Sequence, residues 1–275
     1  MTAALPMNRF NRFWGLIAIY VKERIQFRFA FFMTIFTTLL YAVMYYMVWK
    51  AVYNNSTSFP MDWDELITYV MIGQAVNMAR LSPAERRPLL TMGYRIRNGD
   101  LALDLLRPIS LQGQRFVESF SYFLSEFMWV NIPVLLLMIF GLRVSLPPTT
   151  AAALAFPLSL LIGFLIGFAL NLVILTMAFW TRNIFGAQIA KRAIVDIFAG
   201  TLIPFKLFPH WLQVIVEHLP FKGMAYIPLS IWTGDIAGKE IPLALGEQLI
   251  WAALLYGVAM LIWRHAMKII VIQGG

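Results

Sequence analysis

The sequence predicts an all-α integral membrane protein with six transmembrane helices. Of its 275 residues, 60% are hydrophobic and only 13% are charged, whereas an average soluble domain carries about 25% charged residues. The hydrophobic residues occur in long blocks, several of them near the roughly 20 residues that an α-helix needs to cross a bilayer. Basic residues gather at the ends of alternate blocks, as they do in membrane proteins of fixed orientation. We therefore treat residues 1–275 as a single transmembrane domain.

The six expected spans follow the apolar blocks of the sequence. They cover residues 29–52, 65–80, 113–141, 151–180, 189–208 and 244–264. If the N-terminus is cytoplasmic, 17 of the 22 Lys and Arg residues fall in cytoplasmic segments or at their edges. Because Lys and Arg are retained on the cytoplasmic side, we expect both termini to be cytoplasmic.

The segment before the first span, residues 1–28, mixes aromatic residues with Arg9, Arg12, Lys22 and Arg24. A helix of this composition lies in the membrane interface, with its aromatics among the acyl chains and its cations at the headgroups. We expect such an interfacial helix here; the alternative is a cytoplasmic extension of the first span. The segment has neither the clean apolar region nor the small-residue cleavage site of a signal peptide, so we expect it to be retained.

Residues 208–242, between the fifth and sixth spans, are apolar but interrupted by four prolines. These are Pro209, Pro220, Pro228 and Pro242. Proline ends or kinks a helix, so one continuous span is excluded. We expect one or two short helices on the outer side that re-enter part of the bilayer, where irregular backbone must be covered by protein or water.

The most polar stretch lies in the cytoplasmic loop 82–112, where residues 95–109 read R-I-R-N-G-D-L-A-L-D-L-L-R-P-I. Asn98-Gly99 is a turn signal, Asp100 is a candidate N-cap, and Pro108 ends the helix that follows. We expect two short helices, about 89–97 and 101–107, lying flat under the membrane. The alternative is a solvated basic loop, which is common on the cytoplasmic side.

The order I-x-x-G-x-L-x-x-x-L-L-R-P-I at residues 96–109 resembles the cytoplasmic signature of ABC-2 type ABC transporter permeases. Residues 200–212, G-T-L-I-P-F-K-L-F-P-H-W-L, are similar to the end of that family's fifth span and the start of its outer re-entrant helices. Leu219-Pro220-Phe221 and Ile227-Pro228 fit the same region. The tail from Trp263-Arg264 to Gly274-Gly275 resembles that of the subgroup described as ABC-2 family transporter protein, so the resemblance covers nearly the whole chain.

The resemblance implies a permease subunit of an ATP-driven exporter in the bacterial cytoplasmic (inner) membrane. It implies pairing with a second permease chain, identical or paralogous, and docking of two copies of an ABC ATPase that carry the ATP and Mg. The sequence has no G-x-x-x-x-G-K-[ST], the loop that cradles nucleotide phosphates, so we expect no catalytic residue and no cofactor in this chain. The ATPase-coupling residues would be Arg95, Ile96, Arg97, Asn98, Gly99, Asp100, Leu101, Asp104 and Arg107.

Polar side chains inside the expected spans are candidates for a substrate path. They are Gln74, Asn77, Glu126, Asn131, Asn171 and Asp196. Ionisable residues at membrane depth are functional candidates, which favours Glu126 and Asp196. The alternative is structural: interhelical hydrogen bonds for the amides, worth about 0.6 kcal/mol each, and pairing with a nearby basic residue for the two acids.

Composition also excludes several classes of function. There are no cysteines and only three histidines, so thiolate chemistry is absent and we expect no metal site. The net charge of +8 follows topology and not nucleic-acid binding, because the basic residues cluster at span ends. The alternatives are a permease for lipid-linked polysaccharides or glycolipids and a membrane-embedded enzyme. No cluster of His, Asp, Glu or Ser at the membrane face supports the enzyme.

Overall fold

The computed structural model describes residues 14, 15, 17, 28–80, 110–142, 144–181 and 184–269, and their regular structure is entirely helical. The elements are α2 (Arg28–Asn54), α3 (Trp63–Arg80), α6 (Leu111–Glu126), the π-helical segment η1 (Phe127–Asn131), α7 (Ile132–Leu142), α8 (Thr150–Met177), α9 (Phe185–Phe198), the 3-10 helix η2 (Phe205–Leu207), α10 (His210–Glu217), the 3-10 helix η3 (Pro220–Met224), α11 (Tyr226–Thr233) and α12 (Glu240–Ile269).

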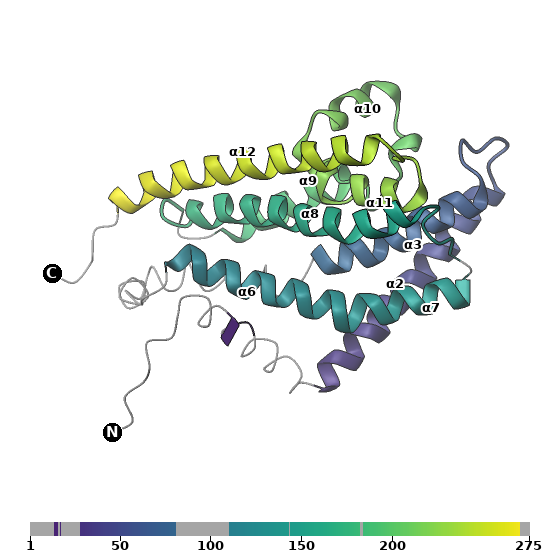
Figure 1. Ribbon diagram of the computed structural model, residues 1–275, viewed down its shortest axis with the longest axis horizontal. Coiled ribbons are helices and arrows are strands. Elements are labelled where there is room, and N and C mark those ends of the chain that lie inside the picture. Colours follow the sequence, from purple (N-terminus) through teal and green to yellow (C-terminus); the bar gives the residue numbers. More distant parts are fainter. Residues whose placement is uncertain are drawn as a thin grey trace.

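The long helices run side by side, and the chain reverses direction between them (Figure 1). The start of α6 and the ends of α8 and α12 lie at one end of the bundle. The end of α7 and the starts of α8 and α12 lie at the other end, together with α10 and α11. We call these the α6 end and the α10 end. By the predicted topology, the α6 end is cytoplasmic and the α10 end is the outer one.

Four of the helices that the structure describes are long and apolar enough to cross a membrane. They are Phe32–Asn54, Leu111–Leu142, Thr150–Met177 and Glu240–Lys268, and they correspond to the first, third, fourth and sixth expected spans. The all-helical membrane class is therefore confirmed, whereas the count of six spans stays a prediction. The structure also places Leu111 and Gln112 inside α6, so this helix begins before the predicted end of the cytoplasmic loop.

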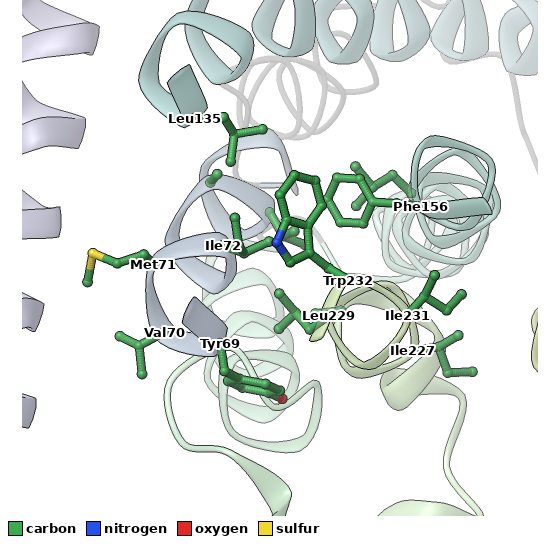
Figure 2. Close-up of a cluster of buried hydrophobic side chains, with 14 of the residues drawn as sticks. Tyr69, Val70, Met71, Ile72, Leu135, Phe156, Ile227, Leu229, Ile231 and Trp232 are labelled. Carbon is green, nitrogen blue, oxygen red and sulfur yellow. The ribbon is translucent and has the colours of Figure 1, made fainter. Parts of the chain in front are cut away.

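The second expected span is α3, which the other helices enclose. Its residues 66–77 are all buried, with Leu66, Met71 and Ile72 fully so. Figure 2 shows side chains of α3 beside Leu135 of α7 and beside Leu229 and Trp232 of α11, while Phe156 of α8 lies against Trp232. Because α3 is surrounded by protein and not by lipid, it can carry polar residues that an isolated span would not tolerate.

The Trp232 side chain joins three parts of this core. Its ring meets the edge of the Phe156 ring with centroids 4.7 Å apart. Its indole Nε1 donates a hydrogen bond of 2.9 Å to the Ser145 carbonyl, in the connection between α7 and α8. An aromatic of this size contributes a large buried area, and its N–H is satisfied. Trp232 therefore fixes α11 against α8 and the preceding loop.

The fifth expected span, 189–208, is not a single helix. The helix α9 begins earlier, at Phe185, and ends at Phe198; its 14 residues would reach only about 21 Å. Gly200 then takes a positive φ of +78°, and a Cβ there would lie 2.8 Å from the Phe205 ring. A residue with a side chain would be strained at this position, so the helix ends before the glycine. The chain continues through η2, and region 208–242 then holds the short helices α10, η3 and α11; their outer, re-entrant placement stays a prediction.

A buried polar contact holds these short helices against α8 and α12. Gln248 of α12 has no exposed surface. It accepts a hydrogen bond of 2.9 Å from the Ser159 hydroxyl and donates one of 2.6 Å to the Gly223 carbonyl. Nearby, a Cβ on Gly163 would lie 2.9 Å from the same Gly223 carbonyl. Small residues permit this close approach of backbones, as is common between membrane helices.

Candidate functional site

The predicted ATPase-coupling segment lies outside the described residues, since 81–109 are not among them. The same is true of the interfacial helix, apart from Trp14, Gly15 and Ile17. The predictions for the nine residues from Arg95 to Arg107 therefore stay predictions. The six polar residues within the expected spans are all described.

Four of those six are buried, and they lie on elements that pack together. Gln74 and Asn77 are on α3, with exposed fractions of 1% and 6%; Glu126 at the end of α6 and Asn131 in η1 expose 4% and 2%. Both α6 and η1 contact α3. The structure therefore places four polar side chains, among them one carboxyl group, in the interior where these elements meet.

Two of these buried side chains keep a polar atom without a partner. Asn131 Oδ1 makes no hydrogen bond to any group in the described part of the chain, and Gln74 Nε2 makes none of normal geometry, although the Gln74 amide lies beside the Tyr45 side chain of α2. A buried polar atom left without a hydrogen bond costs about 1–3 kcal/mol, and native structures contain few of them. One spare donor and one spare acceptor in the membrane interior are groups with which a polar substrate could bond.

Asn131 owes its position to a break in the regular helix. Proline lacks an N–H, so Pro133 cannot donate to the carbonyl four residues earlier, and its ring crowds the preceding turn. The backbone widens into the π-helical turn Phe127–Asn131, where the Ile132 N–H bonds to the Phe127 carbonyl. A π-turn adds one residue, which rotates the next part of the helix about its axis; such turns are frequent at functional sites. Here the turn separates Glu126 from Asn131.

The remaining two candidates belong to a different neighbourhood, around α9. The Lys191 ammonium donates a hydrogen bond of 2.6 Å to Asn171 Oδ1 on α8. Asp196 lies 3.6 Å from Arg192 Nε, one turn earlier on α9. Both residues thus have a basic neighbour on α9. Such contacts are those expected if the two residues stabilise the fold instead of lining a substrate path. The two groups of candidates approach each other at Tyr45 of α2, which is near both Gln74 and Asp196.

An ionic cluster at the α10 end was missed by sequence reasoning. Lys206 in η2 donates hydrogen bonds to Glu65 near the start of α3 and, at 2.7 Å, to Asp235 after α11. Partial burial lowers the pKa of Lys206, but the hydrogen bonds and charges of Asp235 and Glu65 together raise it above its ordinary value. The partners are 141 and 29 residues away in sequence, so no local pattern could have revealed the cluster. We call these three residues the Lys206 cluster.

Comparison with known proteins identifies one family. A family model described as ABC-2 family transporter protein matches residues 39–274. This range includes every described element from α3 onward and most of α2, together with the coupling segment. No curated protein matches the chain.

Proposed function

Because the chain belongs to the ABC-2 transporter family, we propose that it is the membrane-spanning permease subunit of an ATP-driven exporter and is coupled to a separate ATPase. The family match over residues 39–274 is the observation that carries this proposal. Permeases of this family are transmembrane components that lack an ATPase domain of their own and generally work with an ABC ATPase. The sequence has no P-loop motif, which agrees with ATP binding by a separate ATPase chain.

In the proposed mechanism, the ATPase acts on the segment 95–107 at the cytoplasmic side. ATP binding and hydrolysis shift the ATPase between two states, and the permease changes with it because each state favours a different arrangement of the helices. The described helices offer a path for this coupling: α6 comes directly after the segment and continues through η1 into α7. A push at the start of α6 would therefore reach the π-turn that carries Asn131.

The substrate would pass between two permease chains, in contact with the polar groups of the interior. Gln74 and Asn131 are the best candidates for substrate contact because each has a buried atom without a partner among the described residues. Asn171 and Asp196 remain in the proposed path, but their basic neighbours Lys191 and Arg192 give them a structural role as well.

Co-purification tests the proposal. The chain should be expressed with candidate ABC ATPases, purified in detergent, reconstituted, and assayed for ATP hydrolysis. We expect a complex containing two ATPase copies and two permease chains, whose hydrolysis rate responds to transported compounds. A chain that binds no ATPase and does not pair with a second permease would refute the proposal.

A further inference from the structure

One flank of α2 carries two tyrosines at the middle of a candidate membrane span. The span is Phe32–Asn54, and Val43, the twelfth of its 23 residues, is its midpoint. Tyr41 and Tyr45 lie two residues to either side of Val43, so each is only about 3 Å from the midpoint along the helix axis. They are one turn apart and therefore share a side of the helix. Tyrosine is enriched at the two membrane interfaces, so a pair of hydroxyls at mid-depth needs a polar environment.

The neighbouring face of α2 is apolar and exposed. Leu40, Val43 and Met47 expose 54%, 48% and 65% of their surface, which suits contact with acyl chains. Tyr41 is also exposed, at 40%. Successive residues on an α-helix are rotated by about 100°, so Tyr41 lies on a different side of the helix from Leu40. The exposed surface of α2 is thus divided into an apolar face and a flank with hydroxyl groups.

Polar groups from two other helices join this flank. The Gln74 amide of α3 lies beside the Tyr45 side chain, and the Asp196 carboxylate of α9 is close enough to act on it electrostatically. Asp196 in turn lies 3.6 Å from Arg192 Nε, and the Arg192 side chain is 41% exposed. Through their proximity to Tyr45, these groups lie near the middle of the membrane. We call Tyr41, Tyr45, Gln74, Arg192 and Asp196 the α2–α9 polar patch.

Lipid is a poor cover for the α2–α9 polar patch. Acyl chains form no hydrogen bonds, and ionised side chains at mid-depth face the protein interior or a water-filled cavity. Gln74 is buried within this chain, but Tyr41 and Arg192 are partly exposed. Dry contact with a second copy is also unfavourable, because residues near a two-fold axis meet their own copies, which would set Arg192 against Arg192. Water satisfies both side chains.

We propose that the α2–α9 polar patch lines a water-filled path at mid-membrane depth. The inference rests on the proposed function, because the second permease chain would supply the opposite wall. It adds Tyr41, Tyr45 and Arg192 to the residues of the substrate path. It also specifies the class of substrate: a polar compound that forms hydrogen bonds and stays hydrated as it crosses, in place of an apolar one that enters from the lipid.

Cysteine labelling tests whether water reaches the patch. The chain has no cysteine, so a single-cysteine variant carries one thiol. Tyr41→Cys and Leu40→Cys are matched, since both positions are exposed and adjacent in sequence. The full-length chain in membrane vesicles is treated on both sides with a charged methanethiosulfonate reagent. We expect Tyr41→Cys to react at least about tenfold faster than Leu40→Cys, because the reagent attacks the thiolate, which forms in water and not among acyl chains.

Two controls accompany the labelling. Size-exclusion chromatography in detergent shows that each variant is folded, and labelling after denaturation gives the total thiol. Equal rates for the two variants, whether fast or slow, would overturn the proposal. The measurement needs neither ATPase nor substrate, so the two proposals can fail separately. Equal rates in a chain that binds an ATPase would refute the water-filled path alone, whereas selective labelling in a chain that binds none would uphold the hydrated patch and refute the exporter.

Discussion

At the scale of single residues, the buried amide side chains fall into two groups. In one group every polar atom has a hydrogen-bond partner within the described structure, and in the other group at least one polar atom has none. Gln248 makes three hydrogen bonds, to Ser159 and Gly223, whereas Gln74 is similarly buried and keeps Nε2 unpaired. A residue selected for stability satisfies its polar atoms. The contacts of Gln248 are those of a structural residue, whereas Gln74 stays a candidate for contact with the substrate under the proposed function.

Substitution of each glutamine by leucine should distinguish these roles. Gln248→Leu leaves the Gly223 carbonyl and the Ser159 hydroxyl buried without partners, a cost of about 2–4 kcal/mol. Gln74→Leu removes an unpaired donor at similar volume, so the thermal midpoint should stay the same or rise. We expect Gln74→Leu to lower substrate-stimulated ATP hydrolysis of the complex nevertheless. A stable Gln74→Leu variant with normal stimulation would contradict the role of Gln74 in the path.

Lys206 should stabilise the α10 end in a pH-dependent manner. Its pKa in the folded chain is raised, so its contribution is complete below the ordinary lysine value of about 10.4 and is lost as pH rises through the folded pKa. Lys206→Met should cost about 1 kcal/mol at neutral pH, because the pairs are partly exposed. The difference in thermal midpoint from the wild type should disappear in strongly alkaline buffer. Lys239→Met, at an exposed lysine of the same end, should show neither effect.

These residue-scale features were the least predictable from the sequence. The six polar residues all lie on helical segments: Glu126, Asn131 and Asn171 on candidate membrane spans, and Gln74, Asn77 and Asp196 on α3 and α9. Their partners could not be predicted, because Gln248 bonds to residues 89 and 25 positions away and Lys206 to a residue 141 positions away. Pairing over such distances depends on how the helices pack, which a single sequence does not specify.

At the scale of elements, composition and length predicted the long helices well and the short ones less well. Four apolar blocks form helices that can cross a membrane. An apolar segment of sufficient length can lie in lipid as a helix because the helix satisfies its own backbone hydrogen bonds. The block 189–208 has similar composition but is divided at Gly200, where Phe205 packs too closely for a side chain. Pro133 is a local sequence signal for the π-turn. A proline alone does not predict a π-turn, however, because Pro157 lies within α8 and that helix remains regular.

Pro133→Ala should allow the π-turn to relax. Alanine restores the missing N–H donor and removes the ring, so a regular α-helix through 127–133 becomes possible. We expect a higher thermal midpoint and a lower transport rate, because Asn131 would rotate away from its buried position. Pro157→Ala provides the control, since it also adds a donor but alters no π-turn; transport should be unchanged. Retention of full transport by Pro133→Ala would mean that the π-turn has no functional role.

The close packing of α8 against η3 can be tested with glycine substitutions. A Cβ at Gly163 meets the Gly223 carbonyl oxygen at 2.9 Å, whereas a Cβ at Gly246 of α12 meets no atom within 4 Å. Gly163→Ala should push η3 away and destabilise the protein by about 1–3 kcal/mol, as overpacking does. Gly246→Ala should stabilise α12 by up to about 1 kcal/mol. Equal thermal midpoints for the two variants would show that η3 moves without cost.

At the scale of the whole molecule, the two ends of the bundle are built differently. The α10 end is tied together by the Lys206 cluster and by the Gln248 contacts, which link segments distant in sequence. The α6 end carries the donors of Gln112 and Arg115 that are unpaired within the described structure, and the predicted coupling segment precedes α6 directly. Under the proposed function, the ties at the α10 end would hold that end fixed while the ATPase acts at the α6 end.

Charge reversal in the predicted coupling segment tests whether this segment transmits the action of the ATPase to the permease. We predict that Arg97→Glu abolishes ATPase coupling and transport, because it places a carboxylate at the proposed contact, while the chain still inserts and folds. Arg12→Glu removes a basic residue that contributes equally to topology but lies outside the segment, so it should retain transport. Insertion is measured by the accessibility of cysteines introduced at the two ends of α12, and coupling by co-purification with the ATPase. If Arg97→Glu fails to insert, the arginine determines only the orientation of the chain in the membrane. If the variant inserts and transports normally, the segment does not couple the permease to the ATPase.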